Sequence, residues 1–316
     1  MTIFNNYSAI VKSVSGLARE QGINPASQDR VRIGLLIIDA LNSFSDQPYA
    51  DLPVPGASGD YERLAAFVRN NLGRLTAIEL VFDTHTPMQI FHPLFWIDPI
   101  GNPPAPLTEI THEDVTKGIW RINPEVGKVF GKSEKWLNAY ALHYTKTLGK
   151  FTIWPYHALI GSPGHALDCQ IEEAVLAYSL VRQTTPSITM KGTDPFTESF
   201  SAIKPEIMYA HDGSMVGKGN IELLRRLGDY HILVVAGEAD SHCVPKTLEH
   251  VIHWTDNAVV DSALKTSAIY VLKDCTSPVP GFEKQADEAF ESFATAGVHI
   301  VKSTIPMEEW PDIELN

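Results

Sequence analysis

The residues best suited to chemistry lie in the segment GEADSHCV, residues 237–244, which joins an apolar run to a helical pattern. Cys243 falls in the first turn of that predicted helix. A helix N-terminus favours negative charge, which predicts a lowered pKa for this thiol and a nucleophilic thiolate. The same turn leaves free backbone N–H groups that can stabilise an oxyanion during acyl transfer. The alternative is a small buried cysteine that only packs.

Asp39 and Lys191 can supply the base and the cation that a thiol nucleophile needs. Asp39 follows the apolar run GLLII and Lys191 follows SITM, so each residue ends a predicted strand. An adjacent base or cation activates a thiol. Taken alone, such an aspartate is often a helix cap, and such a lysine is usually a surface charge. Their shared placement at strand ends predicts a site made of Cys243, Asp39 and Lys191.

A third group of residues suits a metal ion. Asp83 and His85 form a D-x-H triplet at the end of another predicted strand, and His157 closes the segment WPYH. Carboxylate and imidazole are typical ligands of Zn²⁺ and similar divalent ions. The chain has 12 histidines, so chance proximity is easy, and spacing alone does not connect His157 to the triplet. Whether His92 joins the group stays open.

Alternating strands and helices must position these residues. Apolar runs typical of buried strands cover residues 32–39, 79–83, 187–191, 231–236, 268–272 and 299–302. Helical patterns cover residues 60–74, 166–182, 220–227, 244–257 and 283–296. The alternation predicts an α/β fold with a doubly wound, mostly parallel six-stranded sheet flanked by helices. Ligands bind beyond the carboxyl ends of such strands, where Asp39, Asp83 and Lys191 lie.

The chain is predicted to form a single domain over residues 1–316, with a helical N-terminal extension over residues 1–30. Between about residues 98 and 150 the alternation breaks. Prolines open this stretch, and two short helices are predicted near residues 113–120 and 132–148. We interpret it as an inserted helical and loop segment that suits a lid or an oligomer contact.

Composition excludes several classes of partner. A formal net charge of −13 without a basic run argues against nucleic acid and anionic membrane surfaces. No stretch approaches the roughly 18 apolar residues of a membrane span, and the N-terminus lacks the apolar core of a signal peptide. Three scattered cysteines do not form a disulfide framework, and Cys169 and Cys275 are predicted to pack. We therefore expect a soluble, cytoplasmic protein.

Taken together, these segments resemble the nicotinamidase/isochorismatase-like cysteine hydrolases. The matching segments, in chain order, are IIDALNSF, FDTH, WPYHALIGSPG, MKGTDPFTESFSA and GEADSHCV. Five motifs in the right order are far more specific than any one of them. The resemblance implies the isochorismatase-like fold and a nicotinamidase-like amidohydrolase that converts a small-molecule amide to an acid and ammonia through a thioester. Members of this family often form homo-oligomers.

The resemblance also implies a catalytic role for each matching residue. Cys243 would be the nucleophile, Asp39 the general base and later the acid, and Lys191 the cation between them. The backbone N–H groups of Ala239 and Cys243 would form the oxyanion hole, next to a cis peptide bond between Glu238 and Ala239.

The resemblance implies a divalent metal as cofactor, with zinc expected and iron or manganese as alternatives. Its ligands would be Asp83, His85 and His157. Phe44 and Trp154 match aromatic positions that sandwich a substrate ring in the family, and His242 joins them as a substrate-binding candidate.

Two departures from the nicotinamidase pattern bear on the substrate. A histidine usually follows the D-x-H triplet within a few residues, whereas Gln89 stands near that place and His92 comes later. The inserted segment also separates His85 from His157 by more residues than in compact nicotinamidases.

Three other functions remain open as alternatives. One is hydrolysis of ureido, carbamoyl or maleamic-type amides within the same family. Isochorismatase activity, which cleaves a vinyl ether without the cysteine, fits less well because Cys243 is retained. An alternative of another class is a catalytically silent binding or scaffold protein, since a fold alone never establishes function.

Overall fold

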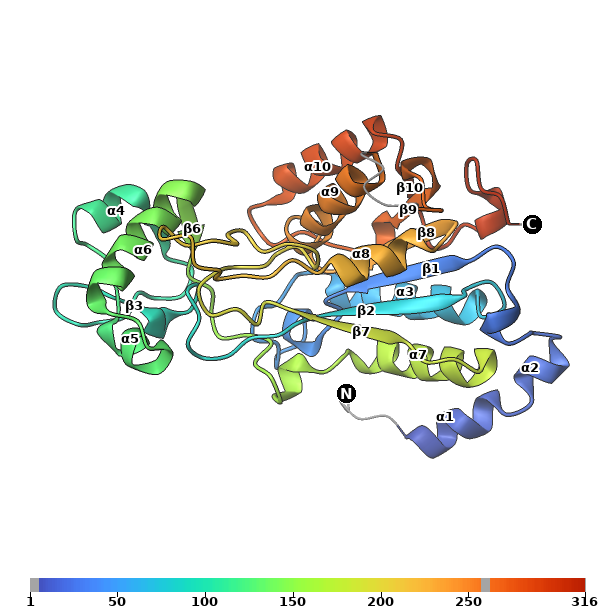
Figure 1. Cartoon of the computed structure of the whole chain (residues 1–316). Coiled ribbons are helices and arrows are strands. Elements are labelled where there is room, and N and C mark those ends of the chain that lie inside the picture. Colours follow the sequence, from blue (N-terminus) through green and yellow to red (C-terminus); the bar gives the residue numbers. More distant parts are fainter. Residues whose placement is uncertain (1–5, 257–261, 316) are drawn as a thin grey trace.

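The computed structural model describes residues 6–256 and 262–315. Its centre is a sheet of six parallel strands in the spatial order β10-β9-β8-β1-β2-β7 (Figure 1). The strands are β1 (Ile33–Ile38), β2 (Ala77–Asp83), β7 (Ser187–Lys191), β8 (Ile232–Gly237), β9 (Ile269–Leu272) and β10 (His299–Val301). The chain adds β2 and β7 on one side of β1 and later adds β8, β9 and β10 on the other. This doubly wound topology confirms the predicted fold class.

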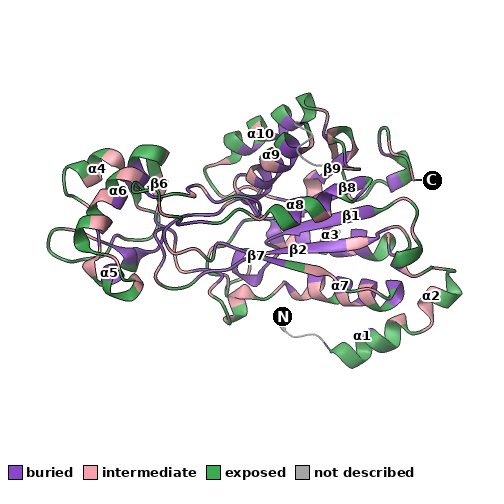
Figure 2. Cartoon of the chain, in the orientation of Figure 1, coloured by how far each residue is buried: buried purple, intermediate pink, exposed green. Residues whose placement is uncertain are grey.

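Helices cover both faces of the sheet because alternate side chains of β1 enter two separate cores. One core packs under α3 (Ala57–Asn70) and α7 (Cys169–Arg182), and the other packs under α8 (Ile221–Gly228), α9 (Cys243–Asp256) and α10 (Glu283–Thr295). All six residues of β1 are buried, as expected for a central strand covered on both sides. Figure 2 shows this buried sheet between helices whose outer faces are exposed.

The predicted elements differ from the observed ones mainly at their ends. Strand β7 has the predicted bounds, while α9 begins one residue earlier than predicted, at Cys243. Asn257, the predicted last residue of that helix, lies outside the described residues. The N-terminal extension contains α1 (Tyr7–Val14) and α2 (Leu17–Glu20), and both contact α7. In the described part of the chain, no helix combines the length and the apolar character that crossing a bilayer requires.

Residues 96–152 form a separate group of elements, which we call the inserted lobe (Figure 1). It contains the helices α4 (His112–Thr116), α5 (Pro124–Phe130) and α6 (Glu134–Leu148). Two antiparallel pairs complete it: β3 (Trp96–Ile97) with β5 (Arg121–Ile122), and β4 (Glu109–Thr111) with β6 (Lys150–Thr152). The sequence predicted α4 and α6 but missed α5 and all four strands, since strands of two or three residues carry no periodic signal.

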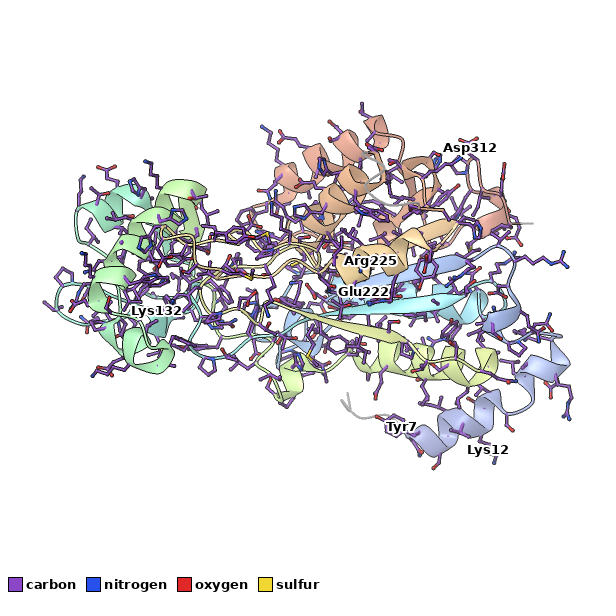
Figure 3. The ribbon with its side chains drawn as sticks, in the orientation of Figure 1. Tyr7, Lys12, Lys132, Glu222, Arg225 and Asp312 are labelled. Atoms are coloured by element: carbon purple, nitrogen blue, oxygen red, sulfur yellow. The ribbon has the colours of Figure 1, made fainter. Side chains whose placement is uncertain are left out.

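The inserted lobe has an aromatic and aliphatic core of its own. Tyr140 and Trp96 are fully buried in it, and Phe196 joins it from the segment that follows β7. This core therefore spans three distant parts of the sequence. Figure 3 shows side chains crowding the region between the lobe and the sheet, while the labelled Glu222 and Arg225 lie on α8, away from that region.

Candidate active site

Four strands of the sheet bring one chemically important residue each to the same edge. Asp39 directly follows β1, Asp83 and Lys191 are the last residues of β2 and β7, and Cys243 begins α9 just beyond β8. The winding direction reverses between β1 and β8, which is where open α/β sheets form their ligand crevice. The structure therefore brings together the three residues that the sequence predicted as nucleophile, base and cation.

Lys191 lies at the centre of this cluster. Its Nζ is 2.8 Å from Asp83 Oδ1, 3.0 Å from Asp39 Oδ2 and 3.5 Å from Cys243 Sγ. Burial alone would lower the pKa of the Lys191 ammonium, but the carboxylates of Asp39 and Asp83 raise that pKa well above its ordinary value. The lysine is therefore a fixed positive charge that touches both the carboxylate and the thiol.

Asp39 is fully buried beside that charge. Burial raises the pKa of its carboxyl, the Lys191 cation lowers it and the charge of Asp83 raises it, with a net result of about 7. Within the described residues, neither Asp39 oxygen accepts a hydrogen bond of normal geometry, although Lys191 lies at ion-pair distance. The residue has a φ of +50°, a left-handed conformation that aspartate tolerates. Asp39 thus has free lone pairs with which to take a proton.

The Cys243 thiol differs from the prediction in its ionisation. Burial raises its pKa well above the ordinary value, even though the Lys191 cation acts in the opposite direction. The lowered pKa predicted from the helix N-terminus is therefore wrong for this site, because desolvation of the thiolate outweighs the helix end and the lysine. A neutral thiol requires a base, and Asp39 is placed to serve as one.

The turn between β8 and α9 has unused backbone donors. The peptide bond between Glu238 and Ala239 is cis, as the resemblance implied. The N–H groups of His242 and Val244 donate to the Ala239 carbonyl at 3.1 and 3.2 Å. Among the described residues, the N–H groups of Ala239 and Cys243 donate to no acceptor. These are the two groups predicted for the oxyanion hole.

Two glycines allow the backbone to approach the site closely. Gly237 has a φ of +117°, and a Cβ added there would lie 1.9 Å from the carbonyl oxygen of Ile38 on β1. Gly192 has a φ of +75°, and its added Cβ would lie 2.7 Å from His85 Cε1 and 2.8 Å from Asp83 Oδ1. Both positions therefore require the absence of a side chain as well as the left-handed conformation.

The three predicted metal ligands converge behind Lys191. One ligand atom each from Asp83, His85 and His157 lies within 4.8 Å of the others, and all three residues are buried. Asp83 Oδ2 is 2.8 Å from His85 Nε2 and 3.5 Å from His157 Nε2. The Nδ1 atoms of the two histidines lie 3.1 Å from the Gly192 carbonyl and 2.8 Å from the Pro155 carbonyl.

This arrangement fits a divalent metal ion. A carbonyl oxygen only accepts, so each Nδ1 carries a hydrogen, and either ring in its neutral form turns an Nε2 lone pair toward Asp83. Two lone pairs and a carboxylate repel one another unless a proton or a cation lies between them. A set of two imidazoles and one carboxylate, with further positions open to water, suits zinc and also iron or manganese.

His92 and Gln89 lie next to the three predicted ligands but outside that group. The His92 ring centre is 5.7 Å from that of His85 and 5.9 Å from that of His157. Its buried Nε2 makes no hydrogen bond in the described part of the chain. Gln89 Nε2 donates to the Gly192 carbonyl at 2.6 Å, so this glutamine holds backbone rather than substrate.

A narrow cavity of about 40 Å³, which we call the inner chamber, lies against the thiol. Its walls include Cys243 and Lys191 and the three predicted substrate-binding residues, Phe44, Trp154 and His242. The ring centres of Trp154 and His242 are 5.7 Å apart. The structure thus gathers every predicted site residue except Asp39 and His85 on or beside this cavity wall, and those two lie directly behind it.

The sequence interpretation missed Glu198 and Phe200, which also line the inner chamber. Burial raises the pKa of the Glu198 carboxyl to about 8, and the charge of Asp83 adds to that rise. Both residues belong to the long connection between β7 and α8. Its length and its start at the carboxyl end of a strand were the available signal, because long loops at that edge commonly carry function.

Comparison with known proteins establishes the fold. No protein-family model and no curated protein sequence matches the chain. The structure of yeast nicotinamidase bound to the inhibitor nicotinaldehyde superposes with a TM-score of 0.54 and 15% identity, covering 85% of this chain and 99% of that one. A nicotinamidase/pyrazinamidase from Acinetobacter baumanii gives a TM-score of 0.55 and 16% identity, covering 88% and 98%.

A third solved structure, PnC1 from L. infantum in complex with nicotinate, gives a TM-score of 0.50 and 17% identity, covering 87% of this chain and 95% of that one. The similarity extends over nearly the whole of each known structure. The chain therefore has the α/β fold of these nicotinamidase structures, which is the fold that its motifs implied. At these identities the similarity establishes the fold alone.

Proposed function

We propose that this chain is a cysteine amidohydrolase of the nicotinamidase/isochorismatase-like family. It would hydrolyse the C–N bond of a small amide, releasing a carboxylic acid and ammonia. One observation supports this function most strongly: the Lys191 ammonium contacts the Asp39 carboxylate and the Cys243 thiol together, at the wall of a cavity. Nucleophile, base and cation are all intact, which argues against a silent scaffold.

In the first half of the reaction, Asp39 accepts the proton of the Cys243 thiol and the sulfur attacks the amide carbon. The negative charge that develops on the amide oxygen is stabilised by the N–H groups of Ala239 and Cys243. The C–N bond then breaks as Asp39 returns its proton to the departing nitrogen. Ammonia leaves, and the acyl group remains as a thioester on Cys243.

In the second half, a water molecule attacks the thioester while Asp39 removes its proton. The C–S bond breaks, the acid is released, and the proton returns from Asp39 to the sulfur. Lys191 stabilises whichever of the two groups is anionic at each step. A base with a pKa of about 7 is well matched to this exchange, because it accepts and returns a proton with little cost.

Asp83, His85 and His157 would hold the divalent metal, with zinc expected first. When bound, such an ion supplies a positive charge that can hold and polarise a substrate atom. Phe44 and Trp154 would contact the substrate ring. His242 would contact it as a neutral imidazole, because burial lowers the pKa of that ring to about 4. A cytoplasmic location and a homo-oligomeric state remain expectations from the sequence.

The test is ammonia release by the purified protein from nicotinamide, pyrazinamide, aliphatic amides and ureido compounds, alongside its metal content. We expect turnover of at least one primary amide and none by the Cys243→Ala variant. An active Cys243→Ala variant would contradict the mechanism. Binding of these amides without any ammonia release would instead indicate a scaffold or binding protein.

A further inference from the structure

A second and much larger cavity adjoins the inner chamber beneath the inserted lobe. This outer chamber has a volume of about 340 Å³, against about 40 Å³ for the inner one. A water molecule needs about 10–15 Å³ of such space, so the inner chamber has room for only a few small groups. Pockets that bind whole ligands typically measure about 300–1,000 Å³. Of the two chambers, it is therefore the outer one that has space for a ligand of ordinary size.

The outer chamber lies between the inserted lobe and the helices near the thiol. Tyr144, Leu148 and Thr152 line it from the lobe, while Lys246 and Gln285 line it from α9 and α10. Neither region alone encloses this space. The inserted lobe thus acts as one wall of a binding cavity.

The boundary between the two chambers consists of side chains. Four residues line both cavities: Trp154, Glu198, Phe200 and His242. The His242 ring centre is 5.7 Å from that of Trp154, 5.3 Å from that of Phe200 and 4.6 Å from that of Phe282. A substrate ring in contact with Trp154 would therefore lie next to aromatic side chains that continue into the outer chamber.

The charges of the outer chamber indicate what it accepts. Lys150 is paired with Glu109 at 2.6 Å, and Lys246 is paired with Glu249 at 3.0 Å. Glu198 and Glu206 also line the chamber, and neither has an ion pair within the described residues. The side chains left without an ionic partner are therefore carboxyls, and burial raises the pKa of both. A carboxylate on the ligand would find no cation to pair with here, whereas a neutral or cationic group can hydrogen-bond or pair with these carboxyls.

We propose that the substrate is the primary amide of an extended acid that occupies both chambers. Its carboxamide lies in the inner chamber, its first ring lies against Trp154 at the boundary, and an apolar or aromatic remainder with a neutral or cationic end lies in the outer chamber. This inference rests on the proposed function. The predicted contact of Trp154 with the ring directs the acyl part toward the outer chamber, so the bulk of the substrate lies on the acid side of the amide bond. The reaction is the one proposed above: the amide and one water give the free acid and ammonia.

The test uses a variant that fills the outer chamber from the lobe, Thr152→Trp, because Thr152 lines only that chamber. Its control is Thr147→Trp, at an exposed position of α6. The probes are nicotinamide, biphenyl-4-carboxamide and N-phenylnicotinamide. We expect Thr152→Trp to lower kcat/KM for biphenyl-4-carboxamide by about tenfold or more, with nicotinamide unchanged. The Thr147→Trp variant should resemble the unmodified protein on both, and N-phenylnicotinamide should not be cleaved.

The following outcomes distinguish failure of this inference from failure of the proposed function. If nicotinamide is hydrolysed but biphenyl-4-carboxamide is a poor substrate, or is insensitive to Thr152→Trp, the two-chamber substrate is overturned and the amidohydrolase stands. If biphenyl-4-carboxamide binds the Cys243→Ala protein in calorimetry, loses affinity on adding Thr152→Trp, and yet no amide is cleaved, the amidohydrolase is overturned. A preference for 4-carboxybenzamide over 4-(aminomethyl)benzamide would overturn the charge assignment.

Discussion

The inner chamber and the inserted lobe show opposite uses of charge. Beside the inner chamber, ionisable groups are buried at strand ends and neutralise one another, with Lys191 between Asp39 and Asp83. In the lobe the core is aromatic and aliphatic, and ion pairs such as Lys128–Glu125 lie on the surface. A buried charge must be positioned accurately to be tolerated, and adjacent parallel strands do this. The lobe contributes the shape of one wall of the outer chamber, and elements shorter and less regular than the strands of the central sheet are sufficient for that.

The largest effect expected from this comparison is at the nucleophile. Cys243→Ala should reduce ammonia release by about a thousandfold or more, because no other group can form the thioester. The matched control is Cys275→Ala, which removes another buried thiol, away from the inner chamber. That control should cost about 1 kcal/mol of stability through lost packing and leave turnover unchanged. Equal losses of activity in both variants would show that Cys243 only packs.

Removing the central cation should have the next largest effect. Lys191→Met leaves two buried carboxylates facing each other, which we expect to lower the free energy of unfolding by about 3–5 kcal/mol and abolish turnover. Lys128→Met in the lobe breaks an exposed pair and should cost only about 0–1 kcal/mol. Urea denaturation followed by circular dichroism compares the two. Similar losses would mean that Lys191 is not the buried counterion described above.

Substituting one glycine in each region distinguishes the cost of a positive φ from the cost of crowding the metal-ligand candidates. Gly192→Ala and Gly131→Ala both force an alanine into a positive φ, at +75° and +66°, which costs about 1–2 kcal/mol. A Cβ at Gly131 meets nothing within 4 Å, whereas one at Gly192 meets His85 and Asp83. Only Gly192→Ala should therefore lose bound metal, measured by elemental analysis of the purified proteins. Retained metal in that variant would contradict the assignment of the ligands.

The smallest effect expected is a pH dependence set by Asp39. Lys191, Cys243 and Asp83 are the ionisable groups that act on it, and its pKa is about 7. The ionised form is the base, so kcat/KM should rise with pH up to about 7 and fall by about tenfold for each pH unit below it. The Lys128→Met variant should give the same profile. A flat profile between about pH 5 and 8 would exclude Asp39 as the titrating base.

The site was more predictable from sequence than the lobe for a physical reason. Asp39, Asp83 and Lys191 each end an apolar run, and parallel strands place such ends together whatever the intervening sequence. The pKa of Cys243 was mispredicted because the depth of burial is not visible in a local segment. The outer chamber was not anticipated, since its walls come from the lobe, the β7–α8 connection and α10, and only tertiary packing unites them.

The two chain segments that lead into and out of the inserted lobe are hydrogen-bonded to each other beside the sheet. The N–H of His85 donates to the Ala158 carbonyl at 3.0 Å, and the N–H of Ile160 donates to the His85 carbonyl at 2.9 Å. The chain therefore leaves β2 and returns to nearly the same point, with the metal-ligand candidates His85 and His157 at either end of the excursion. Because both ends of the excursion are hydrogen-bonded to each other at the edge of the sheet, the segment between them can change in length and composition, and ligand preference with it, while the reactive groups keep their positions.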